Sequence, residues 1–377
     1  MSERLRIALV TERFGRKFGG AEAYAVNLFE ILSKRHDVTV IASEFDHDLP
    51  VTEVCVKRLN RVPSWIRALY FAYQAKKLSS SGYDVVHAHA MGPAGDVHVF
   101  HVVPVKYRRL FMRAKWRGYL SCLQPRNLAY LCLEASSLRC LPGHQVVSVS
   151  PSLTKQLKTA YPSHRTVEMI PPGARVQAID PSLRTRTRQQ LGWHDTDIVC
   201  ILVARDPLLK GLAVSLLALS RLSEQYKLLV IGADEASRKY LLERHPEMKA
   251  RAKMIDPTPS VSAFYQSADI CVHPTLMDSF GMAPLEAMAH RLPVVLSAEQ
   301  YCGFAGYVRH QYDAWVLEHP RDAREMVDAI RTLGESPALR KQIVQQSEAL
   351  VKIFSWEKIA QQYEALYSRV VAQKKTF

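Results

Sequence analysis

Twice along the chain, short apolar runs alternate with segments of helical period, and this pattern limits the possible folds more than any other feature. In the first half it predicts strands at residues 6–10, 38–43, 84–89 and 145–150, with a helix at 21–35. In the second half it predicts strands at 198–204, 227–232, 269–273 and 292–297, with helices at 211–222, 261–268 and 284–290. Strands separated by helices form βαβ units around a parallel sheet. We therefore predict an α/β protein with two Rossmann-like, doubly wound domains.

The pattern breaks at Ile170-Pro-Pro-Gly173, and a polar, Arg-rich stretch follows as far as Gly192. Proline and glycine interrupt regular structure, so we predict an interdomain linker here. The length of 377 residues suits two domains of ordinary size, which we place at residues 1–170 and 173–355. Ligands of such sheets bind beyond the carboxyl ends of the strands, and we expect them in a cleft between two facing domains.

The composition excludes several classes of protein. No apolar run approaches the roughly 18–20 residues of a membrane span. The apolar stretch near the start is too short for a signal peptide, so we expect a cytoplasmic protein. The seven cysteines form no CxxC pair and show no zinc-finger spacing. We therefore expect free thiols and no metal site.

The net charge of +14 is unevenly distributed. Residues 51–150 hold 14 Lys and Arg against 4 Asp and Glu, whereas residues 173–377 hold 26 against 23. A one-sided basic field indicates a polyanionic partner. Nucleic acid, anionic lipid and a phosphorylated saccharide all meet that description.

The segment from Asp278 to Glu286 carries the strongest chemical signal. Gly281 permits a tight turn, and a proline at 284 is tolerated only in the first turn of a helix. Exposed N–H groups around Gly281 and Met282 then form a site for a diphosphate. Glu286 is placed to accept hydrogen bonds from both ribose hydroxyls. The alternative is that this Glu only stabilises the helix dipole.

Two further elements point to phosphate. Arg205 closes a predicted strand and Lys210 precedes the next helix, so both cations should face the edge where the strands end. Gly19 and Gly20 stand between the first strand and the first helix, where a backbone can approach a ligand closely. Neither a GxGxxG nor a GxxxxGK[ST] motif occurs, which disfavours a nicotinamide dehydrogenase and the usual ATPases.

An acidic residue, seven residues and then Glu, after a strand ending in His273-Pro274, resembles the E-x7-E signature of family-four retaining glycosyltransferases. The R…KG element and the early glycine pair occur in the order that this family shows. The chain is also similar to the lipopolysaccharide core glucosyltransferases in the stretches FGGAEAYAVNLFEIL, MIPPGARV, ADICVHP, CGFAGYV and FSW. One position departs from the signature, because its first Glu is the shorter Asp278 here.

This resemblance implies a GT-B fold in which residues 1–170 bind the acceptor and residues 173–355 bind the nucleotide sugar. A helix at 356–377 crosses back to the first domain. In the implied donor site, Glu286 contacts the ribose and Asp278 contacts the donor sugar. The residues implied to contact the diphosphate are Arg205, Lys210, Gly19 and Gly20. The resemblance also implies retention through front-face attack, with the departing phosphate oxygen helping to deprotonate the acceptor. Neither a metal nor a cofactor is expected, because the cations neutralise the leaving group.

Asp96 and His101 are the remaining catalytic candidates, since both follow the predicted strand at 84–89. In the core glucosyltransferases, which this Gly-containing segment resembles, an Asp is the catalytic candidate, and in the wider family a His after a strand has that role. Either residue fits a catalytic role, and the alternative is a polar loop without one.

The run from Lys106 to Tyr119 interleaves basic and aromatic residues. Such a run suits the surface of an anionic membrane, and equally a groove for single-stranded nucleic acid or an ordinary loop. The resemblance favours the membrane, so we expect contact with the inner leaflet and no nucleic-acid partner. The residues predicted to touch the membrane are Lys106, Arg108, Arg109, Phe111, Arg113, Lys115, Trp116 and Arg117.

The function predicted from all these features is transfer of a hexose from a UDP-sugar to the core oligosaccharide of lipopolysaccharide. The acceptor could instead be another glycolipid, an exopolysaccharide or a capsule precursor. A nucleotide-sugar epimerase and a basic RNA-binding protein are the alternatives from other classes.

Overall fold

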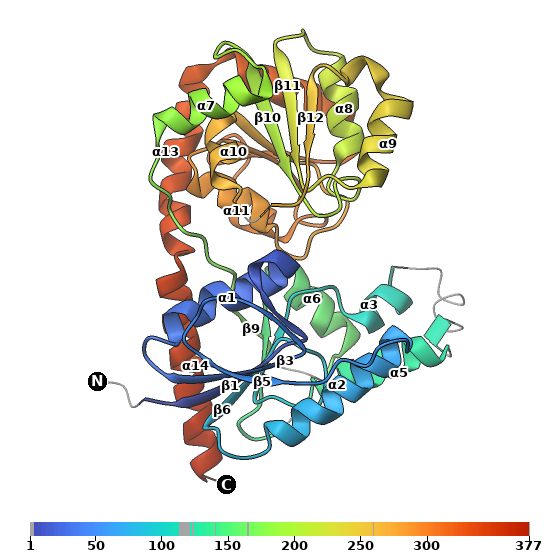
Figure 1. Ribbon diagram of the computed structural model, residues 1–377, viewed down its shortest axis with the longest axis vertical. Coiled ribbons are helices and arrows are strands. Elements are labelled where there is room, and N and C mark those ends of the chain that lie inside the picture. Colours follow the sequence, from blue (N-terminus) through green and yellow to red (C-terminus); the bar gives the residue numbers. More distant parts are fainter. Residues whose placement is uncertain are drawn as a thin grey trace. The chain divides into compact units, whose positions relative to one another are not determined.

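The computed structural model describes residues 4–112, 121–122, 124–139, 141–163, 166–258 and 260–376 (Figure 1). The chain forms two compact units, the first made of Met1–Gly173 and Trp356–Phe377 and the second of Ala174–Ser355. The change from one unit to the other falls at the Pro-Pro-Gly segment. The last helix, α14 (Trp356–Thr376), belongs to the first unit and packs on its helix α1 (Gly20–Leu32) and strand β6 (Val85–Ala88).

The first unit is built on a seven-stranded sheet with the order β5-β3-β1-β6-β7-β8-β9. Every neighbouring pair of these strands is parallel. This is a doubly wound sheet, whose strand order reverses direction between β1 and β6. The other strands of the sheet are β1 (Arg6–Val10), β3 (Asp37–Ala42), β5 (Thr52–Cys55), β7 (Val97–Phe100), β8 (Gln145–Ser148) and β9 (Glu168–Met169).

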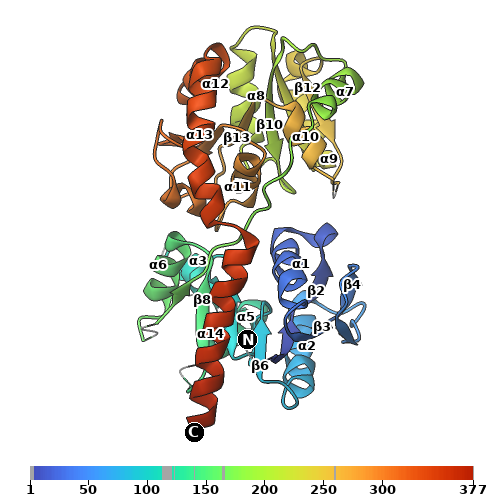
Figure 2. The same ribbon diagram turned by 90° about the vertical axis from the view of Figure 1, so that its left-hand side faces the viewer.

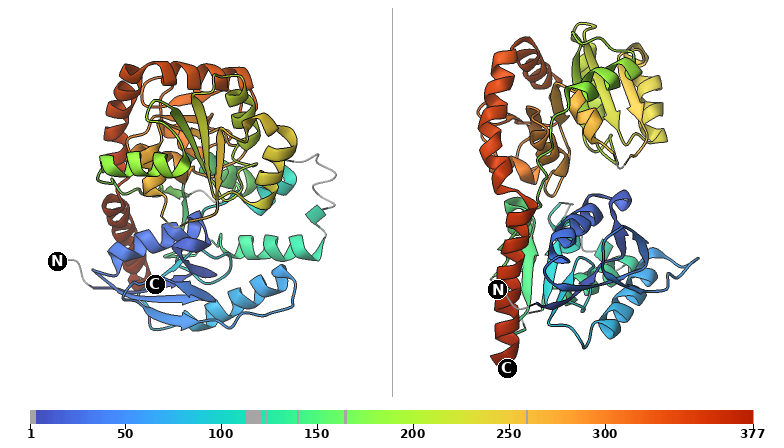
Figure 3. Two further views of the ribbon diagram at one scale, coloured as in Figure 1. Left: turned by 45° about the horizontal axis from the view of Figure 1, so that its top comes forward. Right: turned by 60° about the vertical axis from the view of Figure 1, so that its left-hand side comes forward.

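Helices cover this sheet, which explains why β6 and β7 are buried along their whole length. Helices α1 and α14 pack together, as do α2 and α5, and α14 runs along the sheet (Figures 2 and 3). The two short strands β2 and β4 pair outside the main sheet. The remaining elements of this unit are β2 (Arg13–Gly15), β4 (Glu44–Asp46), α2 (Ser64–Leu78), α3 (Val105–Leu110), α5 (Pro125–Ser136) and α6 (Pro151–Ala160).

Trp356 anchors the start of α14 in the first unit. Its side chain is buried and lies in edge contact with Tyr24, with 5.2 Å between the ring centroids. Gly173 packs so closely on this indole that a Cβ at position 173 would lie 2.7 Å from it. Two residues earlier, Phe354 packs in an aromatic cluster of the second unit. Its carbonyl accepts a hydrogen bond of 2.7 Å from the Ala174 amide. The two chain segments that join the units therefore lie side by side.

The second unit repeats the doubly wound plan with a six-stranded parallel sheet of order β12-β11-β10-β13-β14-β15. Here the strand order reverses between β10 and β13. The strands are β10 (Ile198–Val203), β11 (Tyr226–Ile231), β12 (Ala252–Ile255), β13 (Ile270–His273), β14 (Val294–Ser297) and β15 (Trp315–Leu317). The predicted α/β fold of two Rossmann-like domains is confirmed.

Both faces of the second sheet are covered. Figure 1 shows α8 and α9 on one side of it and α7, α10 and α11 on the other. Leucines of α8 and apolar residues of α12 meet the sheet in one continuous core. The helices of this unit are α7 (Pro181–Leu191), α8 (Leu212–Ser220), α9 (Glu235–Arg244), α10 (Ser262–Ser267), α11 (Met282–Ala289), α12 (Ala323–Glu335) and α13 (Pro337–Ile353).

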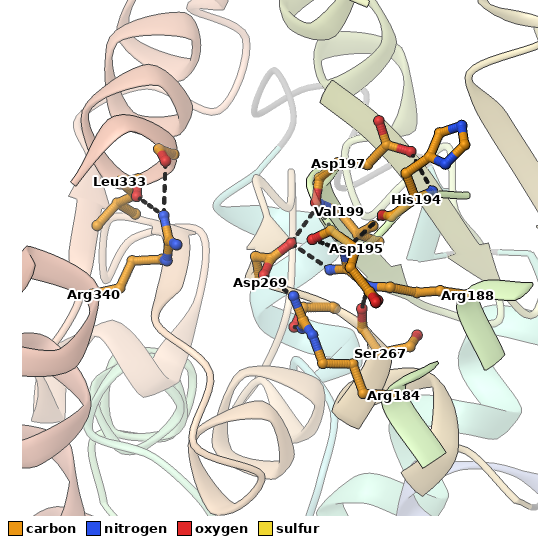
Figure 4. Close-up of polar contacts among 12 residues, drawn as sticks. Arg184, Arg188, His194, Asp195, Asp197, Val199, Ser267, Asp269, Leu333 and Arg340 are labelled. Atoms are coloured by element: carbon orange, nitrogen blue, oxygen red, sulfur yellow. Dashed lines mark hydrogen bonds and ion pairs between the residues drawn. The ribbon is translucent and has the colours of Figure 1, made fainter. Parts of the chain in front are cut away.

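The prediction of a linker extending to Gly192 was wrong, because helix α7 occupies residues 181–191. Asp180 caps the helix by accepting from the Ser182 amide, and α7 packs on α10. Arg188 is 1% exposed, and its guanidinium reaches Asp269 at 2.7 Å as well as four backbone carbonyls (Figure 4). An arginine supplied with so many acceptors is stable in a core. Sequence composition, which treats Arg as a surface residue, does not reveal this.

No helix among the described residues combines the length and the apolar character needed to cross a membrane. The cysteines found free are Cys55, Cys122, Cys132, Cys200, Cys271 and Cys302.

Candidate active site

The turn between β13 and α11 requires glycine at position 281. Gly281 has a φ of 107°, and a Cβ there would lie 2.8 Å from the Cys302 sulfur. Helix α11 begins at Met282. The N–H groups of its first turn have no acceptor within the helix, and Pro284 contributes none. The start of α11 therefore offers the backbone donors and the positive dipole end that bind phosphate.

Asp278 lies just before this turn in a cluster of three side chains. Its Oδ2 is 2.7 Å from Lys210 Nζ and 3.0 Å from His273 Nε2. Burial opposes ionisation of this carboxyl, but His273 and Lys210 together hold its pKa below the ordinary value. Burial also lowers the pKa of His273, which keeps that imidazole neutral. Asp278 is therefore ionised, and its charge is matched by the Lys210 ammonium.

Glu286 lies two residues further into the helix than predicted, because α11 starts at Met282 and not at Pro284. The first turn of α11 therefore holds no acidic residue. The alternative role as a dipole partner is thereby weakened. Its Oε2 accepts a hydrogen bond of 3.3 Å from the Tyr265 hydroxyl. Burial raises the pKa of Glu286 to about 7, and only the Tyr265 hydrogen bond acts against that rise.

Arg205 and Lys210 both lie beyond the carboxyl end of β10. The Arg205 side chain is exposed, whereas Lys210 is partly buried and also donates to the Met277 carbonyl at 3.0 Å. Strand β13, which leads to Asp278, is the neighbour of β10 in the sheet. The second unit thus gathers Lys210, Asp278 and the start of α11 at the point where its strand order reverses.

Gly19 and Gly20 take the corresponding place in the first unit, where the chain passes from β1 to α1. Gly19 precedes the helix with a φ of 157°, and Gly20 is its first residue. A Cβ built on Gly20 would meet no atom within 4 Å. The helix start is therefore open to a ligand.

His101 follows β7 and lines a pocket of about 220 Å³ in the first unit. The pocket lies where β1, β6 and β7 end, and an Arg13–Glu22 ion pair of 2.7 Å forms part of its wall. The His101 Nε2 is buried and has no hydrogen-bond partner among the described residues. Burial lowers the pKa of His101 to about 4, so the imidazole is neutral at physiological pH.

Asp96 does not join His101, and the prediction that both lie at the ligand edge needs correction. The structure has a strand, β7, immediately after Asp96, so this residue stands at the opposite, amino end of the sheet. Its Oδ2 accepts from the Val86 amide at 2.7 Å and from Lys374 Nζ of α14 at 2.5 Å. These contacts give Asp96 a structural role in holding α14, and they leave His101 as the catalytic candidate of the first unit.

The basic run is described only in part. Arg113, Lys115, Trp116 and Arg117 lie outside the described residues. Among the others, Arg108 is exposed and Phe111 is 51% exposed. Lys106 lies over the Tyr161 ring at 4.5 Å, and Arg109 donates to Asn127 at 2.8 Å.

Within the ranges that the structure describes, no group of three or more His, Cys, Asp or Glu side chains is arranged to hold a metal ion.

Two family models match almost the whole length of the chain. Glycosyltransferase Family 4 matches residues 18–178, and Glycosyl transferases group 1 matches residues 184–349. The chain belongs to the family-four glycosyltransferases. This glycosyltransferase has the GT-B fold, as its likeness to solved structures shows. A crystal structure of WaaG, a glycosyltransferase involved in lipopolysaccharide biosynthesis, matches with a TM-score of 0.80 and 20% identity, over 95% of this chain and 98% of that one.

Other comparisons concern sequence relatives and ligands. The lipopolysaccharide glucosyltransferase WaaG of Escherichia coli K12 is 23% identical over 85% of this chain and 87% of the relative. A D-inositol 3-phosphate glycosyltransferase of Arthrobacter is 24% identical over 74% and 68%. HepE of Anabaena in complex with UDP-glucose matches with a TM-score of 0.75 and 17% identity, over 97% of this chain and 100% of that one.

One residue that lines the pocket of this glycosyltransferase was not among the candidates from the sequence. His89, which follows β6, lines the pocket with its ring centroid 4.6 Å from that of His101. The available signal was its place at the carboxyl end of a strand, which is where ligands bind in such sheets.

Proposed function

We propose that this glycosyltransferase moves a hexose, with retention of configuration, from a UDP-sugar to the core oligosaccharide of lipopolysaccharide. The observation that carries the proposal is the Lys210–Asp278 pair beside the start of α11. A cation and a helix N-terminus bind a diphosphate, and an ionised carboxylate accepts hydrogen bonds from sugar hydroxyls. The lipopolysaccharide acceptor is supported by the similarity to WaaG, and the UDP-linked donor by the fold shared with HepE.

In the proposed reaction, the bond between the sugar C1 and the diphosphate oxygen breaks while a bond from C1 to the acceptor oxygen forms on the same face. The acceptor proton passes to the departing phosphate oxygen. Arg205, Lys210 and the first-turn amides of α11 stabilise the negative charge that grows on the diphosphate. No metal ion or cofactor takes part in this scheme, because these groups supply the positive charge.

The test is transfer of labelled sugar from UDP-glucose and UDP-galactose to purified lipopolysaccharide core, with inositol 3-phosphate as a competing acceptor. We expect labelled core, an α-linked product detected by NMR from these α-linked donors, and undiminished activity in EDTA. Labelling of inositol phosphate alone would contradict the lipopolysaccharide acceptor, and a β-linked product would contradict retention.

We further propose that the enzyme associates peripherally with the cytoplasmic face of the membrane through α3 and the residues that follow it. Two observations support this proposal: Phe111 and Met112 are each about half exposed, and Arg108 beside them is exposed as well. Aromatic and apolar side chains insert at the headgroup level, and each basic residue near an anionic surface adds about 1 kcal/mol.

Changing Arg108, Phe111 and Met112 together to Ser is expected to weaken binding to anionic vesicles at least about tenfold, because both the charge and the inserted groups are lost. Co-sedimentation with anionic and with neutral vesicles measures this effect. The matched control is Leu242→Ser with Arg244→Ser on α9, where both side chains are also exposed. Equal loss of binding in both variants, or a preference of the wild type for RNA over lipid, would contradict the proposal.

A further inference from the structure

A chain of hydrogen bonds runs from the His101 pocket of the first unit to the C-terminal helix. His89 Nε2 lies 2.9 Å from His87 Nε2, and His87 Nδ1 lies 2.5 Å from the hydroxyl of Tyr367 on α14. Burial, with a smaller effect of neighbouring histidines, lowers the pKa of both His87 and His89 far below the ordinary value. Both imidazoles are therefore neutral, and each carries a single ring proton.

The position of those protons follows from the partners that each group has. Within the described part of the chain, the Tyr367 hydroxyl bonds only to His87, so its proton has no other acceptor. A phenol is also a stronger acid than a neutral imidazole N–H, so the stronger bond is the one in which Tyr367 donates. His87 then accepts at Nδ1 and carries its proton on Nε2, from which it donates to His89 Nε2. His89 is left with its proton on Nδ1.

The reverse order of protons is less favourable. It leaves the Tyr367 proton buried without an acceptor and the His89 Nδ1 lone pair without a donor. In the order given above, one group alone is unsatisfied, the His89 Nδ1–H, which is buried and has no partner among the described residues. His89 is one of the residues that line the pocket. An oxygen atom bound beside its Nδ1 would supply the missing acceptor.

We infer that Tyr367, acting through His87, holds His89 in the Nδ1–H tautomer, and that this N–H donates to an oxygen of the acceptor saccharide. The inference rests on the proposed function, which supplies a saccharide acceptor, and it assigns that saccharide to this pocket. His101 provides a second nitrogen without a described partner beside the same site. The pocket, at about 220 Å³, is smaller than the roughly 300–1,000 Å³ of sites that enclose whole drug-sized ligands, so it fits one sugar ring. Tyr367 and His87 are positioning residues, and His89 is the group that touches the substrate.

The first test compares Tyr367→Phe with Tyr363→Phe. Both tyrosines are buried on α14 one turn apart, but Tyr363 bonds to the Tyr24 hydroxyl at 2.7 Å and not to a histidine. At saturating donor, Tyr367→Phe is expected to lower kcat/KM for the acceptor about five- to tenfold, as loss of a neutral hydrogen bond does. The donor dissociation constant should stay within about twofold of the wild-type value. Equal effects of the two substitutions would overturn the inference.

The second test reads the tautomer directly in the ligand-free wild type. With ¹⁵N-labelled histidine, two-bond ¹H–¹⁵N spectra distinguish a protonated from an unprotonated ring nitrogen, and the His89→Gln variant assigns the signals. We expect His89 protonated at Nδ1 and His87 at Nε2, with the His89 pattern altered in Tyr367→Phe. A His89 proton on Nε2 in the wild type would overturn the inference whether or not the variants fold. If the tautomer is as expected but the wild type glycosylates no saccharide, the proposed function fails and the tautomer assignment stands.

Discussion

Replacing Lys210 by alanine is expected to lower kcat by about 10²–10³-fold while changing the donor dissociation constant far less. Negative charge on the diphosphate grows as the glycosidic bond breaks, so a cation at this position stabilises the transition state more than the bound donor. Arg205→Ala should act in the same direction. The measurements are steady-state rates at saturating donor and acceptor, together with donor binding by calorimetry.

The second unit offers a matched control for this substitution. The side chains of Lys227 and Lys210 are exposed to nearly the same extent, 18% and 19%. The Lys227 ammonium pairs with Asp197 at 3.7 Å. It lies near the start of β11, at the amino edge of the sheet. Lys227→Ala should therefore leave kcat unchanged. A Lys210→Ala enzyme that keeps the wild-type kcat would show that the leaving group is neutralised by other means.

Glu286→Gln is expected to weaken donor binding at least about tenfold and at the same time to stabilise the ligand-free protein at high pH. Two charge-assisted hydrogen bonds to ribose, worth roughly 1.5–3 kcal/mol each, are lost or reduced when the carboxylate becomes an amide. The gain in stability arises because the pKa of Glu286 is raised to about 7 from an ordinary value of 4.5.

The sign of the pH dependence follows from that rise. Above pH 7 the folded protein holds an ionised, partly buried Glu286. Replacing it by the neutral Gln raises the free energy of unfolding by about 3 kcal/mol at pH 8. As the pH falls through 7, the wild-type carboxyl takes up a proton. The difference in free energy of unfolding between variant and wild type therefore declines to below about 1 kcal/mol at pH 5. Urea midpoints of wild type and variant at the two pH values measure the difference. The control is Glu235→Gln, an exposed residue in the first turn of α9.

If Glu286→Gln binds the donor as the wild type does, the assignment of this residue to the ribose fails. If it binds weakly but shows no pH-dependent gain in stability, the carboxyl titrates near its ordinary pKa and burial does not control it.

Local patterns in the sequence were enough to predict the two doubly wound sheets, because parallel strands buried on both faces are continuous apolar runs. They failed where tertiary contacts override composition. Strand β7 was not predicted, because its valines follow a Gly- and Pro-containing stretch and alternate with histidine. As a result, Asp96 was assigned to the wrong edge of the sheet. Helix α7 was taken for a linker because the acceptors that satisfy Arg188 come from elsewhere in the fold.

The candidate site was predictable only where local sequence patterns determine its structure. Gly281 and the start of α11 follow from local turn and helix chemistry, which a sequence shows directly. The pairing of Lys210 with Asp278 does not, because these residues meet only where β10 and β13 become neighbours in the sheet. Likewise, no local pattern indicates that Tyr367, near the end of the chain, bonds to a histidine on β6.

The side-by-side crossing at Ala174 and Phe354 has a consequence for biosynthesis. On the ribosome, the second unit is contiguous and can fold as soon as residue 355 has emerged from the exit tunnel. The first unit begins earlier but must wait, since the face that α14 covers, with His87 and Tyr24, stays uncovered until the last helix is made. The half of the protein that is translated first is therefore the half that is completed last.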